Sequence, residues 1–247
     1  MPGSPNLNVD HLLSQAWATF KRQPGLCISS WVVFSLLTGS HGGGGGGGGE
    51  GGPVDAALVG ALLLFALFAG GLTLLLGGPI RGGYDLAMAR LQRGDDSVTF
   101  TDIFAGFTKF LPLLLTFVIH AGCVLGGLLL CLVPGLIIMI GLWPAYLLVM
   151  EDDLEPVEAI TTAWKLTQGH KGQLFVLVFA SLGLFVIGTL ACFVGLLVTG
   201  PVVQLAWIGA YDELRKGQAA DGFSVTGSGA LATEEMPGLG SSESPAP

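Results

Sequence analysis

Long apolar runs, separated by short polar connections, make up most of this chain. A helix needs about 20 apolar residues, with a range of roughly 17–25, to cross the hydrocarbon core of a bilayer. Residues 54–80 reach this length, and the runs 109–150 and 173–212 are twice as long, with glycine and proline near the middle of each. The pattern predicts an all-α polytopic membrane protein with six transmembrane helices in three hairpins. The predicted spans cover about residues 24–40, 54–80, 109–130, 133–151, 172–190 and 193–213.

The basic residues predict how these spans are oriented. All ten Lys and Arg residues can be placed on one side of the membrane, and the connections near 40–53, 126–135 and 188–196 contain none. Lys and Arg near helix ends favour the cytoplasmic side. We therefore expect both termini in the cytoplasm.

Amphipathic stretches precede the first, third and fifth spans. They cover about residues 9–20, 100–110 and 156–168, with Thr101 as a candidate N-cap and Pro156 as a suitable first helical residue. Helices of this kind lie in the membrane interface with the apolar face in the acyl boundary. Three copies of interfacial helix plus hairpin would form an internal repeat. Alternatively, any protein with an even number of spans places aromatic and basic residues at its inner surface.

Composition agrees with the membrane class. The 247 residues are 51% hydrophobic and 11% charged, against about 25% charged in a soluble domain, and mean hydropathy is +0.70. The sequence contains no stripe of basic residues, so it does not predict nucleic-acid binding. The glycine run 42–49 is interpreted as a passive tether, and residues 217–247, rich in Gly, Ser, Ala and Pro, as a disordered cytoplasmic tail after the domain 1–216. The four cysteines fall in apolar segments without paired spacing, so we expect buried free thiols.

Ionisable groups are scarce inside the predicted spans. Between the interfaces we find no Asp, Glu, Lys or Arg, which counts against an ion-coupled transporter. His120, near the middle of the third span, is the exception. It could relay a proton or bind a metal, but a neutral imidazole bonded to a backbone carbonyl or to Thr116 is the favoured interpretation. Gln204 is expected to form a helix–helix hydrogen bond.

The acidic run Glu151, Asp152 and Asp153 lies at the cytoplasmic end of the fourth span. Carboxylates could bind a divalent cation or a head group there. The favoured alternative is that acids gather where the dipole of the following helix stabilises them. Asp85 and the acids at 95–96 could join the run if the fold brings them together. His120 and these three acids are the candidate functional residues; no catalytic, metal-binding or cofactor-binding residue is predicted, and no cofactor.

Glycine spacing suggests close helix packing. Gly78 and Gly82, and likewise Gly122 and Gly126, are four residues apart, a spacing that lets helices approach closely. Such pairs serve packing within one chain as well as dimerisation. Phosphate-loop, zinc-protease and nucleophile-elbow motifs do not occur in the sequence.

Four short segments resemble one known family. They are EPVEAI at 155–160, AWKLTQGH at 163–170, VPGLII at 133–138, and GLLVTGP at 195–201 with a later Ala-Tyr at 210–211. They are similar to the membrane domain of glycerophosphoryl diester phosphodiesterases and its uncharacterised stand-alone six-span bacterial relatives. The resemblance covers roughly residues 10–215. It implies a helical domain of the bacterial cytoplasmic (inner) membrane and no activity, because the catalysis of fused members belongs to a separate soluble domain.

These observations favour a non-enzymatic membrane protein with an accessory or membrane-organising role through lipid and helix contacts. The alternative is binding or transport of an apolar or lipid-like substrate. A cation-dependent membrane enzyme at Glu151–Asp153 is third. Expected partners are the lipid bilayer and either a second copy of the chain or another membrane protein.

Overall fold

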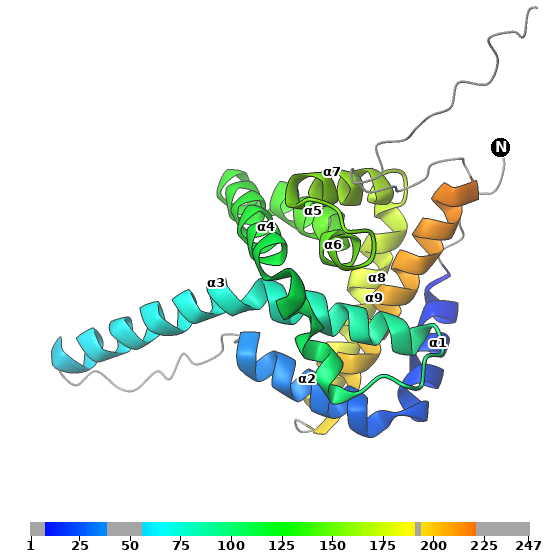
Figure 1. The fold of residues 1–247 in the computed structure, drawn as a ribbon, viewed down its shortest axis with the longest axis horizontal. Coiled ribbons are helices and arrows are strands. Elements are labelled where there is room, and N and C mark those ends of the chain that lie inside the picture. Colours follow the sequence, from blue (N-terminus) through cyan, green and yellow to red (C-terminus); the bar gives the residue numbers. More distant parts are fainter. Residues whose placement is uncertain (1–7, 39–55, 191–193, 221–247) are drawn as a thin grey trace, which may run out of the picture.

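The computed structural model describes residues 8–38, 56–190 and 194–220, and all regular elements within these ranges are helical (Figure 1). The glycine run, residues 221–247 and Cys192 lie outside the described residues. Three described helices are long and apolar enough to cross a membrane, namely Phe100–Leu130, Val133–Glu151 and Lys171–Leu190. The all-α class is therefore confirmed, and the apolar helices are compatible with a membrane protein.

The described elements are all helices. They are α1 (Val9–Arg22), α2 (Pro24–Thr38), α3 (Ala56–Gln92), the 3-10 helix η1 (Phe100–Lys109), α4 (Phe110–Leu130), α5 (Leu132–Leu142), α6 (Ala145–Glu151), α7 (Pro156–Thr167), α8 (Lys171–Leu190) and α9 (Val194–Ala220). The bounds of α4, α5, α6 and α8 lie close to the predicted third, fourth and fifth spans. Whether each crosses a bilayer stays a prediction.

Two helices extend beyond predicted boundaries. The sequence predicts the second span at 54–80, and α3 continues to Gln92 with Pro79 in its interior. The helix continues past the proline because the following turns pack in the core, where Tyr84 and Met88 are fully buried. Likewise, α9 extends through residues 217–220, which the sequence assigns to the tail. Leu214 is buried one turn earlier, and Gln218 donates a hydrogen bond to the Lys165 carbonyl at 3.3 Å.

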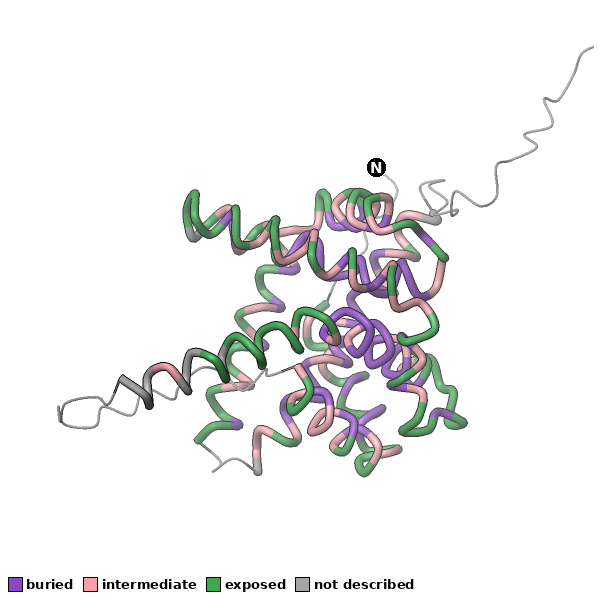
Figure 2. Tube along the Cα trace, turned by 60° about the vertical axis from the view of Figure 1, so that its left-hand side comes forward, coloured by how far each residue is buried: buried purple, intermediate pink, exposed green. Residues whose placement is uncertain are grey.

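The core lies where α6 meets the second half of α3 and α9. All residues from Ala145 to Met150 are buried, and the tube in Figure 2 is coloured as buried at this crossing. α6 packs against α3 and α7, while α8 packs along α9. A helix of seven residues leaves the carbonyls of its last turn without helical partners, and the Lys109 ammonium donates to two of them, those of Val149 and Met150.

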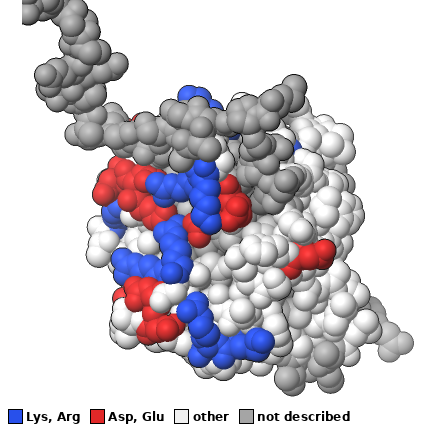
Figure 3. Space-filling model, turned by 90° about the vertical axis from the view of Figure 1, so that its right-hand side faces the viewer, with Lys and Arg blue, Asp and Glu red and all other residues white. Residues whose placement is uncertain are grey.

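Large apolar side chains face outward away from this core. They lie on the first half of α3, on α4 and on α8, and include Leu64, Phe65, Leu67, Phe68, Leu129, Leu130, Phe179 and Ile187. Soluble monomers rarely expose contiguous apolar surface of this extent. Figure 3 shows that Lys and Arg side chains instead form a band with Asp and Glu on one face of the molecule.

The amphipathic stretches differ from their predicted role. α1 buries Leu12, Ala16 and Phe20 and packs along α9, so its apolar face contacts protein where the sequence predicts lipid; Trp17 remains 46% exposed. The second stretch is a 3-10 helix whose N-cap is Thr99, not Thr101. Asp102 explains the shift, because its carboxylate accepts from the Thr99 backbone N–H at 2.7 Å.

The second amphipathic stretch nevertheless keeps an exposed aromatic face. Phe100, Phe104 and Phe107 are each about two-fifths exposed, and consecutive ring centroids along the row to Phe110 lie 6.2 Å apart. Ile103, on the opposite side, is fully buried against α3. A row of this kind suits the interface between lipid and water.

Glycines set the closest helix contacts. Cβ atoms added at Gly83 or Gly106 would overlap the backbone of the other element, so α3 and η1 touch main chain to main chain. A Cβ at Gly82 would lie 2.7 Å from the Leu113 side chain, which assigns the first glycine pair to packing within the chain. At Gly122 and Gly126 an added Cβ meets nothing within 4 Å among the described residues.

The three described cysteines differ in exposure. Cys27 is buried as expected, whereas Cys123 and Cys131 are exposed on the outer surface of the helices. The expectation of buried thiols is thus wrong for these two. Both occur near the end of α4, where side chains face outward from the bundle.

Candidate functional site

The acidic run is held by basic side chains from distant parts of the chain. Glu151 accepts from Arg93 at 2.6 Å and from Arg215 at 2.7 Å, and the Tyr211 hydroxyl donates to it at 3.2 Å. Asp152 pairs with Arg215 at 2.5 Å. These bonds join the end of α6 to α3 and α9. The structure therefore places Glu151 and Asp152 in an ion-pair network that links helices.

Two neighbouring acids lie apart from this network. Asp153 forms an ion pair with Lys109, whose ammonium also donates to the carbonyls of Val149 and Met150 at 3.0 Å each. Asp96 pairs with Arg22 at 3.6 Å. The fold thus distributes the acids among separate basic partners and does not gather them. No group of three or more His, Cys, Asp or Glu side chains with metal-binding geometry occurs in the part of the chain that the structure describes.

Burial and charge pairing shift the pKa values in the network. Burial disfavours the charged form of Arg93, but its hydrogen bonds to Asp212 and Glu151 outweigh this effect and raise the pKa of Arg93. Burial raises the pKa of Asp152, while the adjacent Arg215 opposes the rise. Arg93 therefore stays charged throughout the physiological pH range and can keep its ion pairs with Glu151 and Asp212.

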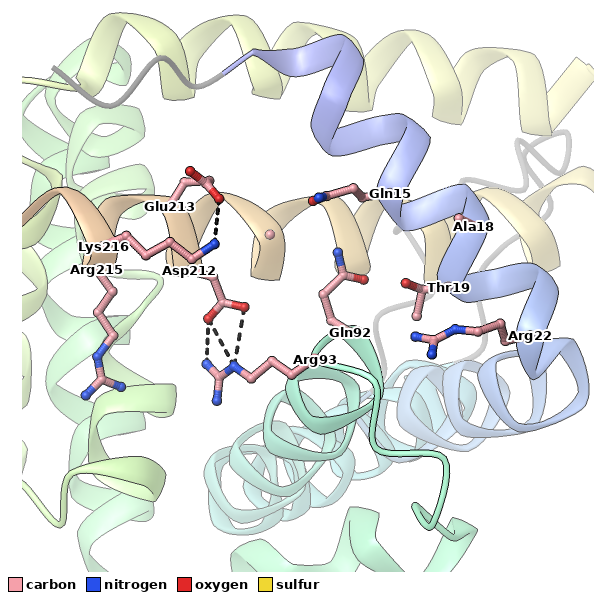
Figure 4. A pocket seen from close by; sticks show the side chains of 11 residues that line it. Gln15, Ala18, Thr19, Arg22, Gln92, Arg93, Asp212, Glu213, Arg215 and Lys216 are labelled. Carbon is pink, nitrogen blue, oxygen red and sulfur yellow. Dashed lines mark hydrogen bonds and ion pairs between the residues drawn. The ribbon is translucent and has the colours of Figure 1, made fainter. Parts of the chain in front are cut away.

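A wide cavity opens beside this network, between α1, α9 and the end of α3 (Figure 4). We call it the charged cavity; its volume is about 840 Å³, and Arg22, Arg93, Arg215 and Lys216 line it together with Asp212 and Glu213. Each of these cations already has an acidic partner: Arg93 donates to Asp212, and Lys216 to Glu213 at 2.8 Å. The cations that line the charged cavity are therefore already paired and offer little free positive charge to a ligand.

A second cavity, of about 260 Å³, lies within the bundle between α2, α3, α4, α5, α8 and α9. We call it the inner cavity. Most of its wall is apolar or aromatic, with polar groups on one side. It is lined by Trp31, Arg81, His120, Met139, Ile140, Trp143, Val178, Phe185, Gly200, Val203, Gln204 and Trp207. A largely apolar cavity with a few convergent polar groups is the usual form of a small-molecule site.

Arg81 and Asp85 place an ion pair beside the inner cavity. Asp85 is 1% exposed, and its Oδ2 lies 3.7 Å from the Arg81 Nε, one helical turn earlier. Gln204 on α9 donates to the other carboxylate oxygen at 2.6 Å, which is the helix–helix hydrogen bond expected of this residue. The Arg81 guanidinium carbon is 5.3 Å from the Tyr146 ring centroid. The group thus links α3, α9 and α6.

Arg81 and Asp85 follow the predicted second span, and the structure packs Asp85 inside the helix bundle. The sequence assigns both to the inner surface because they follow Pro79. Their spacing was the available signal: oppositely charged residues four apart share one face of a helix. Tyr84, Asp85 and Met88 recur at helical spacing, so the same helix continues with its buried face intact.

His120 lies at the level of this ion pair. Its ring centroid is 5.5 Å from that of Tyr146, and it lines the inner cavity with Arg81. The expected bond to Thr116 does not form, and the Thr116 hydroxyl donates to the Pro112 carbonyl at 2.8 Å. The Nδ1 atom of His120 is buried and makes no hydrogen bond to any described residue. Of the four candidate residues, His120 alone lines the inner cavity.

Comparison with protein-family models, curated proteins and solved structures finds no match to this chain. The resemblance to the membrane domain of glycerophosphoryl diester phosphodiesterases therefore stays a prediction from the sequence segments.

Proposed function

We propose that the protein is a six-span membrane protein that binds a lipid-like ligand in the inner cavity. The hairpins would be α2 with α3, α4 with α5 and α6, and α8 with α9. The inner cavity carries the proposal, because it combines an apolar wall with polar groups inside a bundle whose outer surface is also apolar. An amphiphile moving within the bilayer could reach such a site without crossing water.

The one-sided band of charge supports a cytoplasmic orientation for both termini, in a bacterial cytoplasmic membrane. Topology can be tested with Gly46→Cys, in the connection that the sequence predicts to face outward. A membrane-impermeant maleimide should label this variant in intact cells. Labelling that requires opening the cell would invert the proposed orientation. Cys27, Cys123, Cys131 and Cys192 should be replaced by serine or alanine in both this variant and its parent.

Ligand binding can be tested by filling the inner cavity. Val178 lines it from α8, while Val176 on the same helix is 56% exposed outside it. Val178→Phe should reduce the lipid retained by purified protein in native mass spectrometry, and Val176→Phe, which adds the same volume outside, should not. Thermal unfolding in detergent checks that both variants fold. Equal lipid retention in folded wild type and Val178→Phe would overturn the proposal.

An accessory or organising role is the second candidate, and one observation favours it. The face of α4 at Gly122 and Gly126 is open, whereas the pair at Gly78 and Gly82 packs within the chain. A helix of another protein or of a second copy could approach α4 closely there. Gly126→Leu should weaken any such association in cross-linking experiments, and unchanged association would remove this candidate. Neither role requires catalysis.

A further inference from the structure

We propose that the inner cavity selects the anionic head group of a single-chain amphiphile, and that Arg81 supplies the opposing charge. This inference rests on the proposed function and adds the chemical class of the ligand. It depends on the balance of hydrogen-bond donors and acceptors around the inner cavity. It also depends on the volume that the cavity offers.

Two donors without partners belong to residues that line the inner cavity. The Nε of Arg81 and the Nε1 of Trp143 are buried and make no hydrogen bond to any described residue. Arginine and the indole N–H can only donate, and Trp143 is only 7% exposed. The buried Nδ1 of His120, which can donate or accept, has no partner among the described residues either. A buried donor without an acceptor is costly, most of all in a membrane, where no bulk water compensates. Arg81 and Trp143 therefore require an acceptor.

The nearest carboxylate does not meet this requirement. Asp85 approaches Arg81 only through Nε at 3.7 Å, beyond hydrogen-bond distance, and its other oxygen already accepts from Gln204 at 2.6 Å. Asp85 also does not line the inner cavity. Arg81 does line it, and its side chain is 37% exposed. Asp85 thus balances the charge of Arg81 from outside the inner cavity, while Arg81 itself lines the cavity.

Arg81 lies on α3, His120 on α4 and Trp143 directly after α5, so polar residues from three segments line the inner cavity. An oxyanion with several acceptor oxygens, such as a phosphate or a carboxylate, can accept from more than one of them. A cationic head group would have aromatic faces available at Trp31 and Trp207, but Arg81 in the same cavity would repel it. The chemistry of the wall therefore favours an anion.

The volume limits what the inner cavity can enclose. Its 260 Å³ lies below the range of about 300–1,000 Å³ found for sites that enclose a drug-sized ligand. A head group and the start of one chain fit this volume, whereas a whole two-chain lipid does not. Met139, Val178 and Phe185 form the apolar wall beyond the polar side. The chain would contact them and continue into the bilayer.

Binding can be measured by tryptophan quenching, since three of the five tryptophans line the inner cavity. The probes are amphiphiles with the same mid-chain brominated acyl or alkyl chain and a carboxylate, a phosphate, a hydroxyl or a phosphocholine head group. Both anionic probes should bind wild type about tenfold or more tightly than the hydroxyl probe. Inorganic phosphate and acetate compete with the anionic probes if the site binds a soluble anion, and their equal potency would overturn an amphiphile as the ligand.

Variants of Arg81 and Trp143 separate charge from structure. Arg81→Gln should weaken anionic probes by about tenfold or more and leave the hydroxyl probe unchanged. Arg81→Lys keeps the charge and should retain most of the preference. If Arg81→Gln fails to fold, Arg81→Gln with Asp85→Asn removes both charges together. Trp143→Phe removes the indole N–H together with part of the ring volume, and should reduce the affinity for the anionic probes more than that for the hydroxyl probe.

The outcomes distinguish the two proposals. If no probe of any charge binds folded wild type, the proposed function fails. If the hydroxyl or phosphocholine probe binds as tightly as the anionic probes, the function stands and the inference of an anionic ligand fails. An unchanged affinity of anionic probes for a folded Arg81→Gln protein, or for the double variant, would also overturn it.

Discussion

Replacing Glu151 by glutamine tests whether the ion-pair network links α6 to α3 and α9. The side chain is only 10% exposed and accepts from Arg93, Arg215 and Tyr211. Glutamine keeps the size but removes the charge and turns an amide N–H₂ toward one guanidinium. We therefore expect a lower free energy of unfolding. Asp153→Asn is the matched control, since it removes an ion pair two residues away in which the acid is 81% exposed.

The magnitude follows from exposure and from the partners that remain. A hydrogen bond to a charged group contributes about 1.5–3 kcal/mol when buried, and Glu151→Gln weakens one to each of two arginines. Those arginines are 41% and 32% exposed, which reduces each contribution. Each also keeps another carboxylate, Asp212 or Asp152, so no buried cation is left unpaired. We expect a loss of about 2 kcal/mol for Glu151→Gln and below about 0.5 kcal/mol for Asp153→Asn.

The assay is reversible unfolding of purified protein in mixed micelles of mild detergent and sodium dodecyl sulfate, followed by circular dichroism. The slope of the free energy with detergent fraction should agree among the three proteins, so that midpoint shifts report stability. Equal losses in the two variants would refute the argument, because burial would then not decide the contribution. A loss confined to Asp153→Asn would refute it as well.

Two further predictions concern packing. Gly83→Ala should destabilise the protein by about 2–3 kcal/mol, because the added methyl overlaps the η1 backbone; Gly122→Ala, with open space around its Cβ, should be neutral or stabilising by up to about 1 kcal/mol in the same unfolding assay. A permeable maleimide should modify Cys123 and Cys131 in detergent before Cys27, which is fully buried. Peptide mapping measures the order, and early modification of Cys27 would contradict the packing of α2.

The helices that sequence predicts well are those whose ends are marked locally. α8 begins at Lys171 where the pattern predicts a span from 172, because a basic residue precedes the apolar run. The sequence predicts that the second span ends at residue 80, because Pro79 and Arg81 normally mark the end of a span. Here the burial of Tyr84 and Met88 continues the helix, and that burial depends on α6 and α9, which no local pattern reports.

The partners of the acidic run could not be predicted from neighbouring residues, because they also come from distant parts of the chain. Glu151 accepts hydrogen bonds from Arg93 and Arg215, which lie 58 and 64 residues away in the sequence. A carboxylate followed by a helix start reads locally as a dipole effect. Only the packing of α3 and α9 around α6 shows that the run is a link between helices. His120 was identified from its type alone, and its role depends on Arg81, a neighbour from another helix.

The ion pair on α3 offers the sharpest choice between a structural and a ligand-binding role. Replacing a buried ion pair by well-packed apolar residues of similar volume is often neutral or stabilising by about 1–4 kcal/mol. A protein that only organises other helices would therefore gain from Arg81→Met, Asp85→Leu and Gln204→Leu together. We expect this triple variant to fold with unchanged or higher stability, since no polar partner is left alone, and to lose its preference for anionic amphiphiles. Retained preference in the folded triple variant would show that Arg81 does not contact the ligand. Marked destabilisation would show that the pair is needed for packing, in which case its presence within the bundle says nothing about a ligand.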